Sequence, residues 1–523
     1  MANSEIFSSH NSIAATDTIN EAGGVAYSLD DRSALAQYIM TGVFSDTFYS
    51  QAKYQAKIIV ELINKIDDHE FVGKLAVYGR KNGFMKDTPA FLLAWLASKS
   101  HKNAQKILRK TFPIVIDNGK MLRNFVQIIR SGVFGRKSLG SLPKKLIQNW
   151  FKNHDANYIF NNSIGKNPSL QDVIKLSHPN PNNLEKDALF GYLLDKDYKF
   201  NNLPSLVKEY ITYKAGDTQN IPNIPFQFLS SLDLPEDAWK TIALNGGWHM
   251  VRMNLNTFAR HNVYEDKNIV NAIADKLRDE DTIKKSKVFP YQLLTTFQNV
   301  KDIPSEITLA LQDAMEIATQ NVPVLSGNVF ILPDTSGSMG SSVTGYRNGI
   351  ESKTRCIDVA GLMASCILRN NPNAKVIPFA ENVKHIALNS RDSVMTNAQR
   401  LANLGGGGTN CSAPLEEILK CKYDVDTIIY ISDYESWMDA DEKSFQNYYQ
   451  TTSSMEIWNK IKKRNKNAKC VCIDVTPSTT TQLKTSKDIL NIGGFSDQVF
   501  NVINGFVNNI DKTIVNIIND IEI

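Results

Sequence analysis

Apolar side chains recur at two different spacings along this chain. From about residue 30 to residue 320 they return every three or four positions, as at Leu122, Phe125 and Ile129. This is the spacing of helices that each bury one face. Points rich in Gly, Asn and Pro, such as His178–Pro181, interrupt the pattern. It therefore predicts stacked helical pairs that repeat irregularly.

After Val324–Gly327 the pattern changes to short apolar runs that alternate with helical stretches. The strands we expect are 328–333, 374–379, 426–432 and 469–475, with a last one near 498–502. The helices we expect lie near 355–369, 391–403, 412–421, 441–464 and 504–520. This alternation predicts a doubly wound α/β domain with a mainly parallel sheet. Ligands of such sheets bind at the carboxyl ends of the strands.

The length and composition are those of a soluble protein with more than one domain. The chain has 523 residues, of which 42% are hydrophobic and 21% charged, and no apolar run is long enough to span a membrane. Residues 1–20 lack the basic and apolar parts of a secretory signal, so we expect a flexible polar tail there. The six cysteines show neither zinc-binding nor disulfide spacing, which favours a reduced, cytoplasmic protein.

Positive charge is concentrated in one segment of the helical part. Residues 101–153 contain twelve Lys and Arg but a single acidic residue, Asp117. Such a run repels itself unless a polyanion binds it, and Lys and Arg that neutralise phosphates dominate affinity for RNA. The residues expected to contact phosphate there are Lys120, Arg123, Arg130, Arg136, Lys137, Lys144 and Lys145. The neighbouring Trp150 and Phe151 are expected to be core residues rather than base-stacking ones.

Oxygen-bearing side chains follow two of the predicted strands and one glycine-rich loop. Asp334, Ser336 and Ser338 form a D-x-S-x-S motif directly after the first strand, Thr409 follows four glycines, and Asp433 ends the strand 426–432. An all-oxygen ligand set suits a hard divalent cation, Mg²⁺ first. The sequence therefore predicts a magnesium site at the carboxyl edge of the sheet.

These three parts, in this order, resemble the metal-ion-dependent adhesion site of von Willebrand factor A domains. Aspartyl phosphotransferases are an alternative, but they need a second Asp where Ser336 stands. We find no other catalytic set, and we do not expect an enzyme. Asp358, on the next predicted helix, is expected to orient a metal ligand from outside the ligand set.

A helical segment followed by such a domain resembles the Ro autoantigen family, whose N-terminal module is called TROVE. The segments that carry the resemblance are Gly23–Asp31, Leu75–Arg80, Met85–Pro89, Asp172–Pro179, Trp248–Leu255 and Ser286–Pro290. The resemblance implies a multidomain protein, with an all-α HEAT-like repeat ring (TROVE) at 21–325 and a doubly wound A domain at 326–523, after the tail 1–20. The chain is identified as a member of this family because these segments occur in the family's order and the metal motif follows them.

The resemblance also implies a function. Ro proteins bind single-stranded 3′ ends of misfolded non-coding RNA in the ring and Y RNA outside it, and they act in RNA quality control as ribonucleoprotein components. An exoribonuclease is a candidate partner, and a monomer is expected. The resemblance suggests His178 as a contact to Y-like RNA, although a histidine that ends a helix is an equal alternative. Arg252 is our candidate for a phosphate contact lining the hole.

One alternative function stays open. A metal-bearing A domain on a helical scaffold is also expected of a protein–protein interaction module, in which a partner's carboxylate completes the metal site. Loss of binding with added salt would indicate RNA, whereas loss with chelation would indicate such a protein partner.

Overall fold

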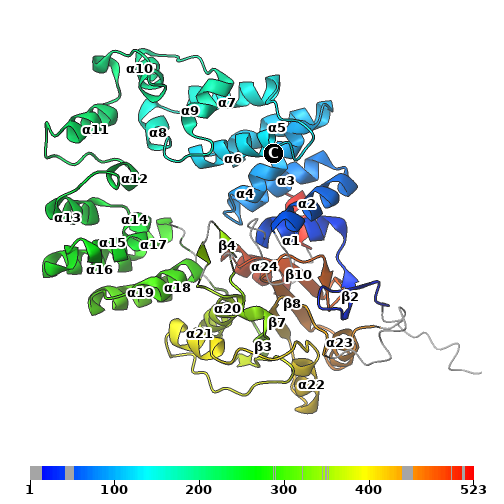
Figure 1. Cartoon of the computed structure of the whole chain (residues 1–523). Coiled ribbons are helices and arrows are strands. Elements are labelled where there is room, and N and C mark those ends of the chain that lie inside the picture. The colour runs from blue at the N-terminus through cyan, green and yellow to red at the C-terminus, as the bar shows by residue number, and fades with distance from the viewer. Residues whose placement is uncertain are drawn as a thin grey trace, which may run out of the picture. The chain divides into compact units, whose positions relative to one another are not determined.

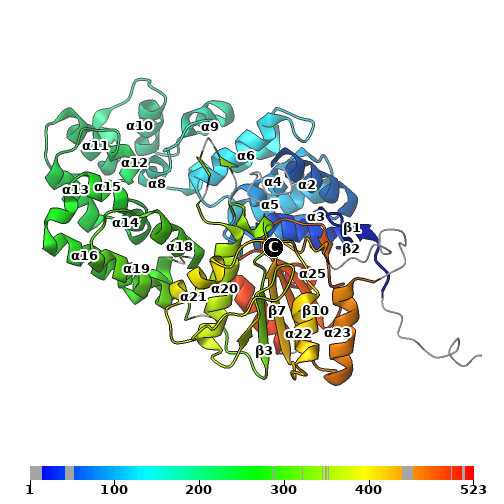
Figure 2. The same ribbon diagram turned by 60° about the horizontal axis from the view of Figure 1, so that its bottom comes forward.

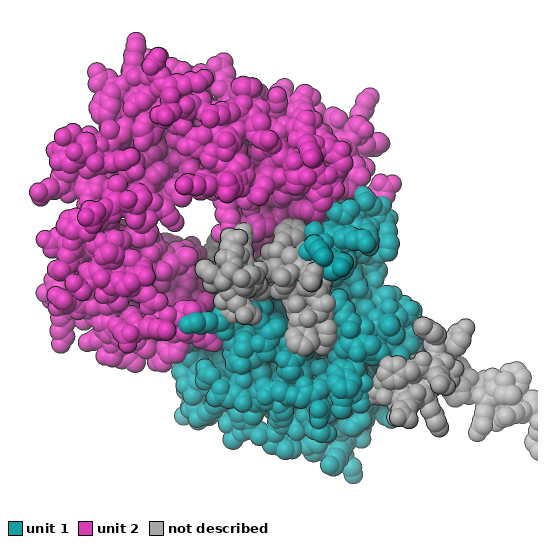
Figure 3. All heavy atoms as spheres, in the orientation of Figure 1, with its two compact units in different colours: residues 1–66, 319–517 teal, residues 67–318, 518–523 magenta. Residues whose placement is uncertain are grey.

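The computed structural model describes residues 14–41, 52–286, 288, 290–320, 322–343, 346–347, 350–351, 353–438, 451–495, 497–508 and 513–523. These residues form two compact units, coloured separately in Figure 3. One unit contains residues 1–66 and 319–517, and the other contains 67–318 with 518–523. Within the described parts, no helix is both long and apolar enough to cross a membrane.

The first unit is built on a five-stranded parallel sheet with the order β10-β8-β7-β3-β6. Its strands are β3 (Val329–Pro333), β6 (Lys375–Val376), β7 (Thr427–Ser432), β8 (Lys469–Asp474) and β10 (Ile489–Gly493). Three of them, β3, β7 and β8, are buried along their whole length, as expected for a sheet that is covered on both faces. If the five strands are numbered 1 to 5 along the chain, their order across the sheet is 5-4-3-1-2. The direction of winding therefore reverses between β3 and β7.

Helices cover both faces of this sheet (Figures 1 and 2). They are α20 (Cys356–Asn370), α21 (Val394–Ala402), α22 (Ala413–Lys420), α23 (Ser453–Arg464) and α24 (Asp497–Val507). Helix α25 (Ile514–Asn519) follows α24 in the chain. On one face Leu415 of α22 and Trp458 of α23 join the same apolar core as Phe330 of β3. On the other face α20 packs against β3 and β7, and α21 packs against α20. The doubly wound α/β fold predicted from the sequence is confirmed.

Three details of the predicted α/β order are wrong. The helix expected near 504–520 is two helices, α24 and α25, and residues 508 and 513 between them are not helical. The last strand is β10, not residues 498–502, which lie in α24. Val499, Phe500 and Ile503 are buried at helical spacing, and this explains why that segment is a helix. The helix expected at 441–464 starts at Ser453 among the described residues, and 439–450 lie outside them.

The N-terminal segment folds with the sheet domain, not with the helical unit. Strands β1 (Thr18–Ile19) and β2 (Val25–Ser28) pair with each other, and β2 pairs with β9 (Thr480–Thr481) to give a three-stranded sheet. Helix α1 (Asp31–Thr41) contacts β10, and α2 (Ala52–Ile66) packs on α1. Residues 14–20 of the tail expected over 1–20 are ordered, because their backbone pairs with β2 and Tyr27 donates to the Ala14 carbonyl (2.9 Å). Residues 1–13 lie outside the described residues. The unit also contains the hairpin β4 (Tyr346–Arg347) and β5 (Ile350–Glu351) and the short helix η3 (Ser338–Gly340).

The second unit is all-helical in its described residues. Its helices are α3 (His69–Lys81), α4 (Asp87–Ser98), α5 (Lys102–Val115), α6 (Gly119–Ser131), α7 (Ser141–Asn153), α8 (Ala156–Asn161), α9 (Leu170–Ser177), α10 (Leu184–Leu193), η1 (Phe200–Asn202), α11 (Ser205–Ala215), α12 (Phe226–Leu229), α13 (Glu236–Asn245), α14 (Trp248–Met253), α15 (Leu255–Arg260), η2 (Val263–Glu265), α16 (Lys267–Arg278), α17 (Glu280–Ser286), α18 (Pro290–Asn299) and α19 (Ser305–Ala318).

Each helix of this unit packs mainly on helices close to it in sequence. Helix α3 contacts α4 and α5, α4 contacts α6, and α16 contacts α13, α14 and α19. In Figure 1 the helices from α3 to α19 follow one another along a curve within the unit. Contacts between near neighbours are typical of stacked helical repeats, so the helical class predicted for this region is confirmed.

Candidate metal centre and nucleic-acid interface

The predicted metal ligands lie on loops that meet where the winding of the sheet reverses. Asp334 follows β3 and Asp433 follows β7, and these two strands are neighbours in the sheet. This edge is where open α/β sheets bind their ligands. The side chains of Asp334, Ser336, Thr409 and Asp433 are each at most 2% exposed, and that of Ser338 is 6% exposed.

Asp334 is held by two hydrogen bonds within this edge. Its Oδ1 accepts the Ser336 N–H (2.7 Å), and its Oδ2 accepts the Ser432 hydroxyl (2.6 Å). The Ser336 and Ser338 hydroxyl oxygens lie 3.2 Å apart. Ser432 is a site residue that the sequence analysis missed, although its place beside Asp433 at the end of an apolar strand is a signal for it.

Backbone hydrogen bonds join the three loops. Gly337 donates its N–H to the Gly407 carbonyl (2.8 Å), and Gly406 donates to the Thr335 carbonyl (2.9 Å). The φ angles of Gly406 and Gly407 are 122° and 99°, a region that only glycine adopts freely. Trp437, beyond Asp433, donates its N–H to the Thr409 carbonyl (3.1 Å). The four-glycine run therefore leads to Thr409, whose carbonyl is bonded to the loop that follows Asp433.

The two aspartates are buried close together. Burial raises the pKa of Asp334 to about 7, and the neighbouring Asp433 carboxylate contributes to the shift. Burial likewise raises the pKa of Asp433, while the Ser338 hydroxyl acts in the opposite direction. Neither carboxylate forms an ion pair with a Lys or Arg among the described residues. A cation stabilises buried carboxylates in their ionised form, so two carboxylates and three hydroxyls fit a hard divalent cation.

Further acidic residues surround this centre. Burial raises the pKa of Glu435 to about 8, and the Asp433 carboxylate is the second cause of the shift. The same two causes raise the pKa of Glu21. Glu435 accepts the Ala22 N–H (3.2 Å). Glu21 belongs to the N-terminal segment, and no local pattern in the sequence indicated that it lies near Asp433.

Asp358, which was expected to orient a metal ligand, has no hydrogen bond to a predicted ligand among the described residues. It lies in the first turn of α20 and pairs with Arg355, whose Nη2 is 2.9 Å from Oδ1. Its Oδ2 accepts the Arg355 backbone N–H (2.8 Å), which completes a capping arrangement at the start of the helix. Asp358 therefore stabilises the start of α20.

Five of the predicted phosphate contacts are exposed on α6, on α7 and between these helices. They are Lys120, Arg130, Lys137, Lys144 and Lys145, and we call them the basic surface. None of the five forms an ion pair with an acidic residue in the described part of the chain. Asp117, the acidic residue of this segment, pairs instead with Arg80 at 2.9 Å. The basic surface thus carries a concentrated positive charge that no carboxylate of its own segment neutralises.

The other two cations predicted in this segment bond to backbone carbonyls. Arg123 is half-buried and donates to the carbonyls of Asn162 and Ile164. Arg136 donates to the carbonyls of Ser138 and Ala97, both at 2.9 Å. These hydrogen bonds occupy guanidinium groups that were expected to contact phosphate. Trp150 and Phe151 are buried, as expected for core residues.

Arg252 is also placed differently from the expectation. Its side chain is 8% exposed, and Nη1 donates to the Gln292 carbonyl (2.8 Å) and to the Thr296 hydroxyl. Burial lowers its pKa to about 10. The guanidinium therefore joins α14 to α18, and its burial argues against a phosphate contact.

His178 caps the carboxyl end of α9. Its φ is 51°, and its N–H donates to the Ile174 carbonyl (2.8 Å). This is the left-handed cap that ends many helices, and the ring is exposed. The geometry accounts for the position of His178 as a cap, and its contact with RNA stays a prediction.

Comparisons with known proteins agree with this architecture. Residues 329–507 match the family model of the Ro60 vWA domain. The RNA-binding protein RO60 of Deinococcus radiodurans is 23% identical over 451 residues, which cover 80% of this chain and 83% of that protein. The crystal structure of the Deinococcus radiodurans RO (RSR) protein matches with a TM-score of 0.60 at 18% identity, over 91% of this chain and 99% of the other. This structural likeness shows a shared fold.

Proposed function

From the A domain of the Ro60 family that the chain carries, we propose that it is an RNA-binding protein. The comparisons together support the Ro/TROVE family for the whole chain. The observation that carries the proposal is the basic surface, five exposed cations on and between α6 and α7 without acidic partners among the described residues. Phosphates release condensed counterions when such cations neutralise them, and this is the main source of affinity for RNA.

We further propose that its RNA is misfolded or structured non-coding RNA, which it binds by single-stranded 3′ ends, with Y-like RNA as a second class of ligand. In this role it acts in RNA quality control as a monomeric, cytoplasmic ribonucleoprotein component, not as an enzyme. An exoribonuclease or another RNA-processing protein is its proposed partner. The relative named as an RNA-binding protein supports the first step, and six free cysteines suit a reducing compartment.

The test is RNA binding across a salt series. A structured RNA with a single-stranded 3′ tail is compared with the same RNA ending blunt, on wild type and on Lys120→Ala/Arg130→Ala/Lys137→Ala. We expect the tailed RNA to bind more tightly. We expect the variant to lower affinity and to reduce the slope of log K against log [salt] by roughly one per lost phosphate contact.

A matched control separates the basic surface from net charge. Lys196, Lys199 and Lys214 are exposed in the same unit, and their side chains make no ion pair in its described residues. Their triple alanine variant removes the same charge and is expected to leave the slope nearly unchanged. Equal losses in both variants, or no binding of either RNA at moderate salt, would contradict the proposal.

A second candidate function rests on the residues beside the metal centre. Trp437 and Met438 are 44% and 40% exposed, and both donate their N–H to the Thr409 carbonyl at 3.1 Å. Exposed aromatic and methionine side chains are enriched in protein interfaces. We propose that Asp334, Ser336, Ser338, Thr409 and Asp433 hold Mg²⁺, which when bound can accept an oxygen ligand from outside the domain. Protein binding that chelation abolishes and salt leaves unchanged would favour this function over the first.

A further inference from the structure

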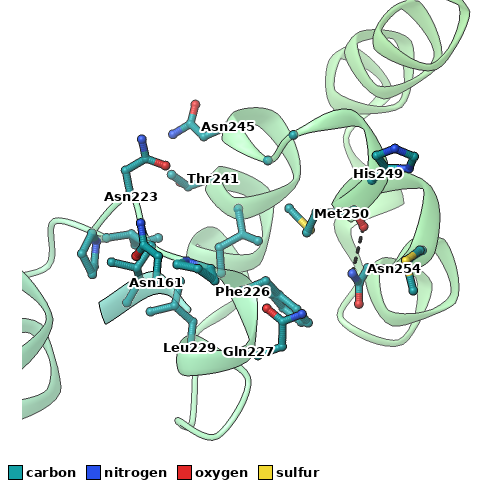
Figure 4. Close-up of a pocket in the computed structure, with 18 residues that line it drawn as sticks. Asn161, Asn223, Phe226, Gln227, Leu229, Thr241, Asn245, His249, Met250 and Asn254 are labelled. Atoms are coloured by element: carbon teal, nitrogen blue, oxygen red, sulfur yellow. Dashed lines mark hydrogen bonds between the residues drawn. The ribbon is translucent and has the colours of Figure 1, made fainter. Parts of the chain in front are cut away.

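A cavity of about 910 Å³ lies within the helical unit. Its wall is formed by residues 221–229, the end of α13 and α14, with Asn161 of α8 (Figure 4). No Asp, Glu, Lys or Arg lines it. Its volume lies in the range of cavities that bind small organic ligands, and it is separate from the basic surface.

Side-chain amides are the main polar groups of this cavity. Asn223, Gln227 and Asn245 are exposed, and their amides form no hydrogen bond with the described residues. Asn161 Oδ1 is buried without a partner there. Asn254 is the exception, because its Nδ2 donates to the Met250 carbonyl (2.8 Å). Figure 4 shows Asn223 and Asn245 near each other on one side and Asn254 on the other. Each amide offers both donors and an acceptor.

Apolar groups complete the wall. Phe226 is half-buried, and its ring lies 5.6 Å from that of Trp239. Met250 lies between the two polar sides in Figure 4, and Met253 is 74% exposed at the cavity. Ring faces and polarizable thioethers pack well against flat ligands. The cavity therefore offers flat apolar contact together with unpaired amides.

A tight junction between α13 and α14 holds this arrangement. A Cβ on Gly246 would lie 1.8 Å from Met250 Cε and 2.8 Å from the Ile242 carbonyl oxygen. A side chain at this position therefore has no room. The short turn brings Asn245 and Met250 to the same cavity.

From these contacts we infer that the cavity binds an unpaired nucleobase of single-stranded RNA. A base presents donors and acceptors on its edge and a flat face above and below, and proteins recognise unpaired RNA bases by such edges and by stacking. A lining without charged side chains disfavours phosphate or carboxylate ligands, which need a cationic partner. The inference rests on the proposed RNA-binding function and adds base recognition to its phosphate contacts.

The experiment uses the full chain and a labelled 12-nucleotide single-stranded RNA. Abasic sites placed one at a time keep the phosphates and remove single bases. For wild type we expect affinity to fall about tenfold at one or two positions, the range that base stacking supplies. Asn223→Ala/Asn245→Ala should bind the intact RNA about tenfold more weakly and lose this preference for particular positions. Its salt slope should equal that of wild type, because no phosphate contact is removed.

Asn271→Ala is the matched control, since Asn271 is exposed on α16 and does not line the cavity. The other source of a base is a free nucleotide, and a free nucleoside monophosphate tests it. If the nucleotide competes with the RNA at micromolar concentration and no abasic site weakens binding, the cavity belongs to free nucleotides and the inference is overturned. Salt-dependent RNA binding that no abasic site weakens would overturn it while leaving the proposed function intact. Failure of wild type to bind RNA at all would reject both.

Discussion

At the scale of single residues, the position of a cation matters more than its charge. Arg123, Arg136 and Arg252 all bond to backbone carbonyls, whereas Lys120 and Lys137 remain exposed without an acidic partner among the described residues. An arginine has five donors in a rigid fork, so it can satisfy carbonyls at the ends of several segments at once. The three arginines thus stabilise the helical unit, and the lysines are left to interact with ligands.

Arg252 gives the first prediction. Arg252→Ala removes a buried guanidinium that donates to the Gln292 carbonyl and the Thr296 hydroxyl, which keep the hydrogen bond between them (2.9 Å). We expect a loss of about 2–4 kcal/mol in the free energy of unfolding, with an RNA dissociation constant that stays within about twofold at a temperature where the variant is folded. Urea unfolding and RNA titration measure the two effects.

Arg260→Ala serves as the control, because Arg260 is exposed on α15 and bonds only to Thr257 among the described residues. It should change the free energy of unfolding by less than about 0.5 kcal/mol. A stable Arg252→Ala protein with a large loss of RNA affinity would instead make Arg252 a phosphate contact.

At the scale of elements, loops from neighbouring strands create the metal centre. The D-x-S-x-S loop after β3, the glycine loop before α22 and the loop after β7 are joined by backbone hydrogen bonds. Two buried carboxylates lie among them without a basic partner in the described residues. Because the order of the strands reverses at this point, their ends leave room for a ligand.

The second prediction concerns metal binding. Mg²⁺ in hundredfold excess over its dissociation constant should stabilise the wild-type A domain by about 2.7 kcal/mol and raise its melting temperature by several degrees. Asp334→Asn should lose this shift, yet without Mg²⁺ it should be at least as stable as wild type, because the variant buries one uncompensated carboxylate fewer. Differential scanning calorimetry with and without Mg²⁺ measures both effects.

Asp424→Asn is the matched control, since Asp424 is exposed in the same unit. It should keep the full response to Mg²⁺. The predicted ligand set is wrong if Asp334→Asn responds to Mg²⁺ as wild type does.

Local pattern predicted most elements of the sheet domain, and the reasons are physical. Strands β3, β7 and β8 are fully buried and therefore read as continuous apolar runs. The last strand was misplaced because the run 489–493 contains Asn491 and ends at a glycine, while α24 carries more apolar residues. The predicted ligand loops lie together because strand ends in a parallel sheet share one edge.

The partners of the arginines lay beyond such reasoning. Arg136 bonds to a carbonyl 39 positions away, and Arg252 to one 40 positions away. Any carbonyl can accept such a bond, so no residue type marks the partner in the sequence. Basic residues could be counted from the sequence, but which of them stay exposed depends on how the helices pack.

At the scale of the whole molecule, distant parts of the chain complete one unit. Asn20 donates its side-chain N–H to the Ser436 carbonyl at 2.7 Å, across 416 positions of sequence. Strand β2 pairs with β9, and the Tyr27 hydroxyl lies 2.6 Å from that of Thr451. The first 66 residues therefore cluster with 319–517, whereas the sequence placed the boundaries at residues 20 and 325. The stability of the loop after β7 should depend on a segment near the N-terminus.

The third prediction tests this dependence. A Cβ at position 24 would lie 2.0 Å from the Ser436 carbonyl oxygen and 3.1 Å from Trp437 Cα, both backbone atoms that cannot rotate away. Gly24→Ala should therefore force the N-terminal strands off this loop and cost about 1–3 kcal/mol of unfolding free energy, as overpacking does. Hydrogen exchange should become faster in 427–438. Gly247→Ala is the control, because a Cβ there meets nothing within 4 Å, and it should leave the unfolding free energy and the hydrogen exchange unchanged. If residues 427–438 of Gly24→Ala exchange at the wild-type rate, the N-terminal segment does not stabilise the loop.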